Sequence, residues 1–239
     1  MTEYLYHTDS YLREFDAGVL FSDTVNRFVV LDRTAFYPGG GGQLCDLGTL
    51  SLGSQTWQVE KTRKGPEGIE HLLAGADPLP GKGSLIKASL DWERRYRLMR
   101  THTAMHILCG VIFRDFGAQV TGGDMDLQQG RMDFEFESMT RDLVDVIEQA
   151  VNHEVEKNLP VRVKILPREE AFKIPDLIRT KINLLPPGIP EVRTVEIVGL
   201  DLQADGGTHV ASTSEVGRMR IVDYKSKGKI NKRIYIELE

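Results

Sequence analysis

The residues best suited to chemistry form two pairs that lie far apart along the chain. His102 and His106 are four positions apart in the stretch RTHTAMH, and Asp205 and His209 have the same spacing in DGGTH. On a helix, positions i and i+4 project from one face, so two imidazoles at this spacing can reach a single ion. The second pair lies on a glycine-rich turn. Together the pairs predict one zinc site, assembled from a helix and a loop.

The ligand set leaves the role of the carboxylate open. Three neutral imidazoles suit Zn²⁺, which accepts nitrogen, sulfur and oxygen ligands. Asp205 either supplies a fourth ligand as an oxygen, or orients a histidine and leaves the fourth position to water or substrate. Cys109 follows His102 by two helical turns, but its short side chain would have to reach back along the helix. We therefore expect Cys109 to be an ordinary buried thiol.

Three stretches together resemble a known family. RTHTAMHIL, VGLDLQADGGTHVASTSEVG and LDRTAFYPGGGGQLCDLG are similar to the editing domain of alanyl-tRNA synthetase and its free-standing relatives, the AlaX trans-editing proteins. The resemblance runs over most of the chain. It implies one Zn²⁺ per chain, held by His102, His106 and His209. Asp205 stands where the family usually has cysteine, and this harder oxygen ligand should weaken zinc binding.

The resemblance also implies an activity. The expected reaction is hydrolysis of the ester that joins serine or glycine to a tRNA for alanine. A pocket built for alanine excludes glycine and serine poorly, so a second site is needed to remove them. Zinc either activates water or positions the substrate while another group, such as the vicinal ribose hydroxyl, handles the water. The alternative is a non-catalytic tRNA-binding protein with a structural zinc.

Four consecutive glycines, residues 39–42, follow Thr34-Ala35-Phe36-Tyr37-Pro38. Glycine permits positive φ and close backbone approach. The Lys-Ser/Thr ending of a P-loop is lacking, so binding of nucleotide phosphates is not expected. By resemblance the motif lies against the editing pocket, with Gly40, Gly41 and Gly42 binding substrate and Thr34 and Gln43 as candidate catalytic residues. Thr34 would donate to or accept from the serine hydroxyl, and Gln43 would hold the loop or the substrate; the alternative is a bulged hairpin.

Positive charge is local. The net charge of −5 argues against non-specific binding of nucleic acid over the whole surface. Two clusters flank the candidate site in sequence and predict a phosphate track, unless they are merely solvated faces. The candidate tRNA contacts are Arg94, Arg95, Arg97, Lys225, Lys227 and Lys229. Arg100, directly before the histidine pair, is a candidate substrate contact.

The pattern of apolar residues predicts an α+β fold in two domains. Within residues 1–88, short runs of alternating apolar and polar residues are separated by glycine, aspartate and proline, as in a small β-barrel. Residues 89–239 should form an α/β editing domain with helices packed on an antiparallel or mixed sheet. A helix is expected from Asp91 as N-cap to about Gly117, a second within 140–159, and strands before and after them. The loop from Gly75 to Gly83 is expected to act as a hinge.

Composition and termini exclude several classes of protein. The hydrophobic fraction of 41% is that of a globular protein, and no run is long enough to span a membrane. The N-terminus lacks the pattern of a signal peptide, and two cysteines do not suggest a disulfide framework. We therefore expect a cytoplasmic protein, with no membrane contact and no obligate protein partner.

Overall fold

The computed structural model describes residues 2–179, 185 and 188–239. It has an α+β fold with an N-terminal barrel, as the sequence predicts. The chain divides into two compact units, residues 1–96 and 97–239. No helix in the described part of the chain is both long enough and apolar enough to cross a membrane.

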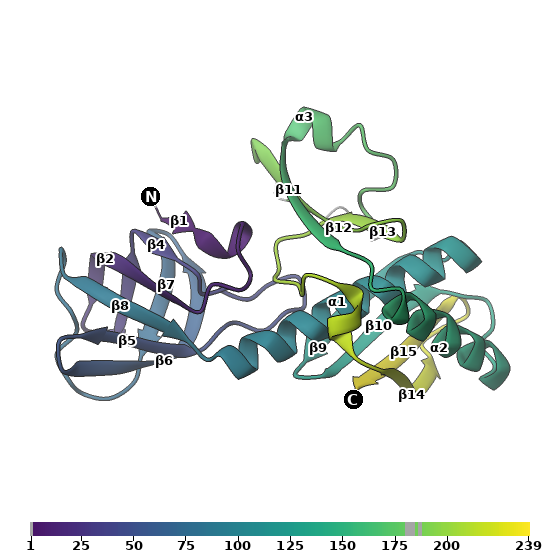
Figure 1. Cartoon of the computed structure of the whole chain (residues 1–239), viewed down its shortest axis with the longest axis horizontal. Coiled ribbons are helices and arrows are strands. Elements are labelled where there is room, and N and C mark those ends of the chain that lie inside the picture. The colour runs from purple at the N-terminus through teal and green to yellow at the C-terminus, as the bar shows by residue number, and fades with distance from the viewer. Residues whose placement is uncertain (1, 180–184, 186–187) are drawn as a thin grey trace. The chain divides into compact units, whose positions relative to one another are not determined.

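The first unit is built on a closed barrel of six strands (Figure 1), in the order β2-β3-β7-β6-β5-β8. Alternate residues point inward, as the buried positions of β2 and β8 show, and they fill the barrel with apolar side chains such as Leu31, Leu50 and Trp57. A short parallel pair, β1 and β4, and the 3-10 helix η1 (Leu5–His7) accompany the barrel. The strands are β1 (Glu3–Tyr4), β2 (Glu14–Asp23), β3 (Phe28–Leu31), β4 (Arg33–Thr34), β5 (Gly48–Leu52), β6 (Gln55–Gly65), β7 (Gly68–Leu73) and β8 (Leu85–Leu90).

The hinge expected from Gly75 to Gly83 is wrong, because this loop joins β7 to β8 within the barrel. The division between the units falls instead inside helix α1 (Trp92–Phe116), after Tyr96. Asp91 accepts the backbone N–H of Arg94 through Oδ1 at 3.1 Å, which is the expected N-cap contact. Arg94 and Arg95 then bond residues of the barrel unit, so the first turn of α1 belongs to that unit.

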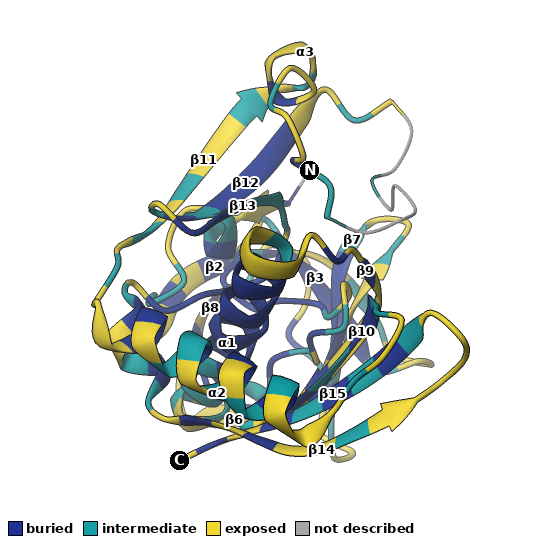
Figure 2. Ribbon diagram, turned by 90° about the vertical axis from the view of Figure 1, so that its right-hand side faces the viewer, coloured by how far each residue is buried: buried dark blue, intermediate teal, exposed yellow. Residues whose placement is uncertain are grey.

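The second unit has a four-stranded antiparallel sheet in the order β14-β15-β10-β9. Residues 101–112 of α1 are all buried (Figure 2). Met105 of α1 lies so close to Gly130 of β10 that a Cβ there would be 2.6 Å from the methionine sulfur. Helix α2 (Arg141–Glu156), capped by Thr140, packs on β14 through Asn152, whose Oδ1 accepts the N–H of Met219 at 2.9 Å. The strands are β9 (Val120–Asp126), β10 (Gln129–Glu135), β14 (Met219–Ser226) and β15 (Asn231–Leu238).

A second antiparallel sheet, in the order β11-β12-β13, carries one side of the candidate site. It comprises β11 (Val161–Pro167), β12 (Glu191–Ile197) and β13 (Asp201–Ala204), with α3 (Arg168–Ala171) directly after β11. The 3-10 helix η2 (Thr213–Val216) comes after the loop that follows β13. It starts with a capping box formed by Ser212 and Glu215. Strand β13 ends one residue before Asp205, and therefore fixes where that carboxylate lies.

Candidate metal centre

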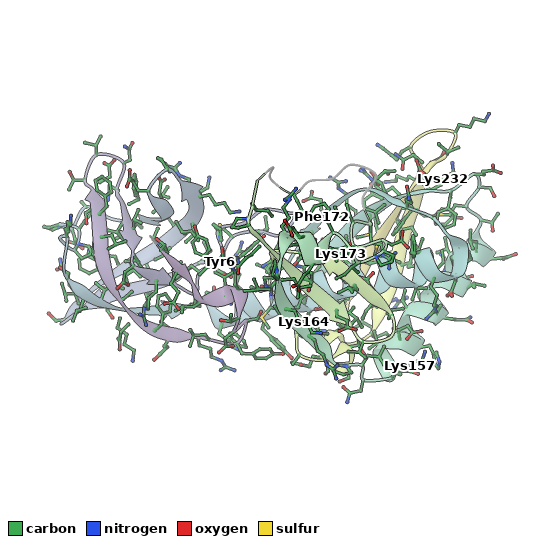
Figure 3. All side chains as sticks on the ribbon, turned by 90° about the horizontal axis from the view of Figure 1, so that it is seen from above. Tyr6, Lys157, Lys164, Phe172, Lys173 and Lys232 are labelled. Carbon is green, nitrogen blue, oxygen red and sulfur yellow. The ribbon has the colours of Figure 1, made fainter. Side chains whose placement is uncertain are left out.

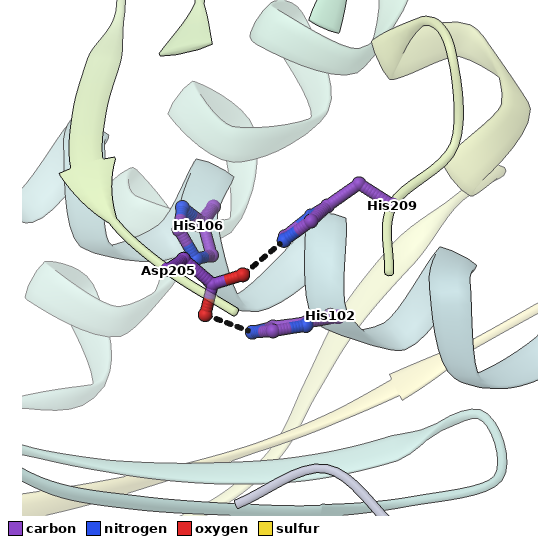
Figure 4. Close-up of side chains that lie close together, drawn as sticks. All are labelled: His102, His106, Asp205 and His209. Carbon is purple, nitrogen blue, oxygen red and sulfur yellow. Dashed lines mark hydrogen bonds and ion pairs between the residues drawn. The ribbon is translucent and has the colours of Figure 1, made fainter. Parts of the chain in front are cut away.

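The two residue pairs singled out in the sequence come together in the second unit (Figure 4). One ligand atom from each of His102, His106, Asp205 and His209 lies within 4.8 Å of the others. The ring centroids of His102 and His209 are 4.2 Å apart, and those of His106 and His209 are 4.7 Å apart. Asp205 Oδ2 lies 3.0 Å from His209 Nε2, and Oδ1 lies 3.5 Å from His102 Nε2. This arrangement can hold one metal ion, and Cys109 is not part of it.

The helix and the loop position the four side chains in different ways. Helix α1 fixes His102 and His106 by its regular spacing. The loop after β13 is fixed by its own hydrogen bonds, because Asp205 Oδ2 accepts the N–H of Gly207 at 2.7 Å. Arg193 of β12 donates to the Asp205 carbonyl oxygen at 2.9 Å and lies 3.6 Å from its Oδ2. Both carboxylate and backbone of Asp205 are therefore held.

Hydrogen bonds on the outer side of two imidazoles determine which nitrogen faces the cluster. His106 Nδ1 donates to Asp201 Oδ2 at 3.1 Å. His209 Nδ1 lies 3.1 Å from the hydroxyl of Thr103, which also accepts the backbone N–H of Val210. With Nδ1 engaged in each ring, Nε2 is the atom left to bind an ion.

Burial sets the protonation of the cluster. It lowers the pKa of His102 to about 4, and together with the neighbouring His102 it lowers the pKa of His209 well below its usual value. For His106, burial is outweighed by the hydrogen bond and charge of Asp201, so its pKa is raised. Burial disfavours ionised Asp205, but the neighbouring histidines hold its pKa well below the usual value. Neutral His102 and His209 beside an ionised carboxylate are the forms that bind cations.

Comparisons with known proteins identify the family of the chain. A family model described as threonyl and alanyl tRNA synthetase second additional domain matches residues 192–235, which include Asp205 and His209. A second, tRNA synthetases class II (A), matches residues 12–94. Alanyl-tRNA editing protein AlaX-M of Saccharolobus solfataricus is 40% identical over 98% of this chain and 98% of its own length. The chain belongs to the AlaX-M family of alanyl-tRNA editing proteins.

Other AlaX-M relatives and larger proteins match in the same way. The AlaX-M protein of Methanosarcina barkeri is 40% identical over 100% of this chain and 99% of its own length. An alanine–tRNA ligase of Ignicoccus hospitalis is 37% identical over 92% of this chain, but over only 24% of the ligase. The AlaX-M fold thus corresponds to one part of that larger enzyme.

The glycine motif of this AlaX-M chain forms a tight hairpin turn in the first unit. Gly40 and Gln43 exchange two backbone hydrogen bonds, each 3.0 Å long, and Gly39, Gly40, Gly41 and Gly42 all have positive φ. Tyr37 Oη donates to the carbonyl oxygen of Gly40 at 2.9 Å. The Gln43 side chain is buried. Glycine is required here by backbone conformation, because positive φ is costly for other residues.

Thr34 is buried, and its hydroxyl has two partners. His71 Nδ1 lies 3.2 Å from the carbonyl oxygen of Val29, which can only accept, so Nδ1 carries the hydrogen. His71 Nε2 therefore accepts the Thr34 hydroxyl at 2.9 Å. The Thr34 oxygen also accepts the N–H of Phe36 at 3.1 Å. Burial lowers the pKa of His71 to about 4, which keeps this tautomer neutral. Thr34 can accept one further hydrogen bond but has no hydrogen left to donate.

The arginines before the histidine pair differ in role. The assignment of Arg95 to tRNA is wrong, because its side chain is fully buried and ion-paired with Asp46. Arg94 is half-buried and donates to the Cys45 carbonyl oxygen at 3.1 Å, and Arg97 is half-buried. Arg100 donates to the Val216 carbonyl oxygen at 2.7 and 3.0 Å and to that of Glu239.

The lysines near the C-terminus lie on the β14–β15 hairpin. Lys225, Lys227 and Lys229 are exposed, and Lys225 is paired with Asp223 at 2.9 Å. Lys232, labelled in Figure 3, is instead buried and donates to the carbonyl oxygens of Gly228 and Lys229 at 2.9 Å each. The three lysines predicted to contact tRNA are therefore exposed, whereas Lys232 is not.

Several residues around the cluster were missed in the sequence. Asp201, Thr103 and Arg193 contact the candidate ligands. Thr103 and Asp201 lie within the stretches that carry the family resemblance, but neither was singled out there. One feature of the sequence could have pointed to Asp201: it is an acidic residue four positions before the candidate ligand Asp205. Thr103 lies next to His102 but faces His209, a contact that no spacing rule predicts.

Proposed function

We propose that this chain is a zinc-dependent trans-editing deacylase. Its substrate would be a tRNA for alanine wrongly charged with serine or glycine, and the reaction is hydrolysis of the ester between amino acid and terminal ribose. The observation that carries the proposal is the buried cluster of three imidazoles and one carboxylate. It occurs in a chain that aligns end to end with proteins named for alanyl-tRNA editing.

The donor set fits zinc better than Mg²⁺ or Ca²⁺. Mg²⁺ and Ca²⁺ prefer oxygen ligands, whereas three nitrogens and one oxygen are typical of Zn²⁺. Three protein imidazoles are also typical of catalytic zinc sites, whereas structural zinc sites are mostly built from cysteine thiolates. When bound, zinc supplies a Lewis acid that polarises a carbonyl group or activates water. This preference favours an enzyme over a tRNA-binding protein with a structural zinc.

Asp205 is suited to act as an oxygen ligand in the place of a thiolate. Its Oδ2 already accepts the N–H of Gly207 at 2.7 Å and faces Arg193. Oδ1 points to His102 Nε2 at 3.5 Å and is the oxygen with fewer described partners. We propose that Asp205 offers Oδ1 to the ion while Gly207 and Arg193 keep the carboxylate in place.

Selectivity for serine is assigned to the first unit. Thr34 would accept the hydroxyl hydrogen of serine, which alanine lacks, since its own hydrogen is given to His71. Gly40, Gly41 and Gly42 would let backbone approach the amino acid, with Gln43 holding the turn and Arg100 contacting substrate. The tRNA would be held by Arg94, Arg97 and the exposed lysines of the β14–β15 hairpin.

Deacylation assays on a matched pair of substrates test the proposal. Ser-tRNA and Ala-tRNA, both made with the alanine tRNA, are incubated with purified protein as isolated, after chelation, and after zinc is restored. We expect hydrolysis of Ser-tRNA that chelation removes and zinc restores, with Ala-tRNA largely spared. Bound tRNA without hydrolysis under all three conditions would instead support the structural-zinc alternative, and full activity in the chelated protein would exclude zinc dependence.

A further inference from the structure

We propose that Asp201 is a positioning residue for the metal site, holding His106 in the tautomer and orientation that bind the ion, and that Gly110 provides the room Asp201 needs. This inference rests on the proposed metal site. It concerns residues that lie outside the candidate ligand set and that perform no chemistry on the substrate themselves.

Asp201 sits at the start of β13 with its side chain fully buried. Three donors converge on this carboxylate. His106 Nδ1 lies 3.1 Å and Gln203 Nε2 2.7 Å from Oδ2, and Arg179 Nε lies 3.4 Å from Oδ1. Arg179 is in turn stacked over the ring of Phe113, with its guanidinium carbon 3.7 Å from the ring centroid. The carboxylate is thus fixed on both oxygens before any ion arrives.

Gly110 is independent evidence that the fold favours the contact between Asp201 and His106. It lies one helical turn after His106 in the interior of α1, where alanine is the better helix former. A Cβ at Gly110 would lie 3.0 Å from the Asp201 Cβ and 2.9 Å from the Leu200 Cγ. The absence of a side chain therefore lets the Leu200–Asp201 turn approach α1 closely enough for the carboxylate to reach His106.

The geometry explains what the contact does. Because Asp201 only accepts at His106 Nδ1, that nitrogen keeps its hydrogen and Nε2 presents a lone pair to the cluster. Asp201 lies behind the ring and so acts through His106 rather than on the ion. The carboxylate also increases the basicity of the imidazole, which strengthens its bond to a cation.

Metal affinity of the metal-free protein measures this role without reference to deacylation. Asp201→Asn keeps the shape and one acceptor oxygen but removes the charge, and Gly110→Ala keeps every polar group while pushing Asp201 away. We expect Asp201→Asn to weaken Zn²⁺ and Co²⁺ binding, measured by competition with a chromophoric chelator, by about 10- to 100-fold. Gly110→Ala should weaken it by a smaller factor in the same direction. In wild-type metal-free protein, ¹⁵N NMR should show His106 with the hydrogen on Nδ1.

Two matched controls separate positioning from general damage. Asp223→Asn removes an exposed carboxylate that pairs with Lys225 and accepts the N–H of Tyr224, and Gly81→Ala adds a methyl group where nothing lies within 4 Å. Both should bind metal as the wild type does. Thermal unfolding of the metal-free variants checks folding, and should Asp201→Asn prove unfolded, Gly110→Ala carries the test.

The outcomes separate this inference from the proposed function. Metal affinities within twofold of wild type in folded Asp201→Asn and Gly110→Ala would overturn the role of Asp201, even if the wild type deacylates Ser-tRNA. A neutral His106 ring with its hydrogen on Nε2 and none on Nδ1 in the metal-free wild type would also overturn it. Weakened metal binding in both variants would support it, even if the wild type proved inactive as a deacylase.

Discussion

Each of the two units buries a cluster of charged and polar side chains, and the two clusters differ in whether they are complete. In the first unit, Arg95 Nε donates to both oxygens of Asp46 at 3.0 Å, and its other nitrogens donate to the carbonyl oxygens of Ser10 and Ala35. Asp46 also accepts the N–H of Tyr37 at 2.6 Å. Every charge in this cluster has an opposite partner within it.

The cluster of the second unit is different in kind. Three imidazoles crowd around one carboxylate, and burial holds the pKa of His102 and His209 below their usual range. Their ring nitrogens converge on the Asp205 carboxylate, and Arg193 borders the cluster with its guanidinium 3.6 Å from Asp205 Oδ2. Breaking a complete buried ion pair destabilises a fold, whereas ring nitrogens that converge on one carboxylate are suited to bind an ion.

Removal of a histidine should have the largest effect. His102→Ala and His209→Ala each take one nitrogen ligand from the cluster, so metal content should fall to that of chelated protein and Ser-tRNA hydrolysis should fall by roughly a thousandfold or more. Metal analysis and single-turnover deacylation measure the two effects. His153→Ala, at an exposed position of α2, is the control and should change neither. Activity retained by either cluster variant would remove zinc from the mechanism.

Removal of Arg95 should affect stability instead. Arg95→Met leaves Asp46 buried without its charge partner, and breaking such a pair costs about 3–5 kcal/mol. Both tryptophans, Trp57 and Trp92, lie in the first unit, so their fluorescence during urea unfolding reports on it selectively. Metal content of folded protein should stay unchanged. Arg33→Met, which breaks an exposed pair with Glu3 in the same unit, should cost under about 1 kcal/mol. Equal losses in the two variants would contradict a structural role for Arg95.

The contrast between Arg95 and its neighbours also marks a limit of reading the sequence. Arg95 stands in an arginine-rich run, and composition alone assigns it to the surface with Arg94 and Arg97. Helical spacing would have placed Arg95 on the buried face of α1, because it precedes Met99 by four residues and His102 by seven. The partner could not be foreseen, since Asp46 lies far away in the sequence and the contact depends on tertiary structure.

Regular periodicity made other parts of the fold predictable. Strands β2 and β8 alternate between exposed and buried residues, α1 begins after the expected capping residue Asp91, and α2 lies within the expected range 140–159. Strand β9, with its Thr-Gly-Gly-Asp sequence, lacks an apolar alternation and exists because β10 pairs with it. Four-residue β13 is too short for a periodic signal. The same limit hid Asp201, whose contact with His106 depends on β13.

Asp205 variants refine the account of the incomplete cluster. Asp205→Cys restores the softer thiolate and should strengthen zinc retention while activity remains. Asp205→Ala should weaken retention by about 10- to 100-fold if the carboxylate is a ligand or orients one. Zinc release to a chelator, followed over time, measures both. Unchanged zinc content in Asp205→Ala would show that the three histidines hold the ion without the carboxylate.

Charge reversal on the β14–β15 hairpin tests the RNA track. The variant Lys225→Glu, Lys227→Glu, Lys229→Glu should weaken tRNA binding by roughly 10- to 100-fold and reduce its salt dependence, because fewer counterions are released. Binding is measured at several salt concentrations. The matched control reverses the exposed barrel lysines Lys61, Lys64 and Lys82, which changes net charge equally. If both triple variants weaken binding alike, net charge rather than the hairpin governs affinity.

Substitution of Thr34 should have the smallest effect. It tests whether the first unit also recognises the substrate. Thr34→Val keeps the shape and removes the hydroxyl. One neutral hydrogen bond contributes about 0.5–1.5 kcal/mol, and more where a buried partner is left unpaired, so Ser-tRNA hydrolysis should fall by roughly three- to thirty-fold while Ala-tRNA hydrolysis stays the same or rises. The substitution also leaves His71 Nε2 without the Thr34 hydrogen, which should lower stability by about 1–3 kcal/mol. Stability loss alone would reduce both hydrolysis rates in proportion, so the serine-to-alanine ratio isolates recognition. Thr34→Ser restores the hydroxyl and should restore that ratio. A Thr34→Val protein with its serine preference intact would mean that the hydroxyl of the substrate is recognised by another group, and that Thr34 and His71 serve only the packing of the barrel.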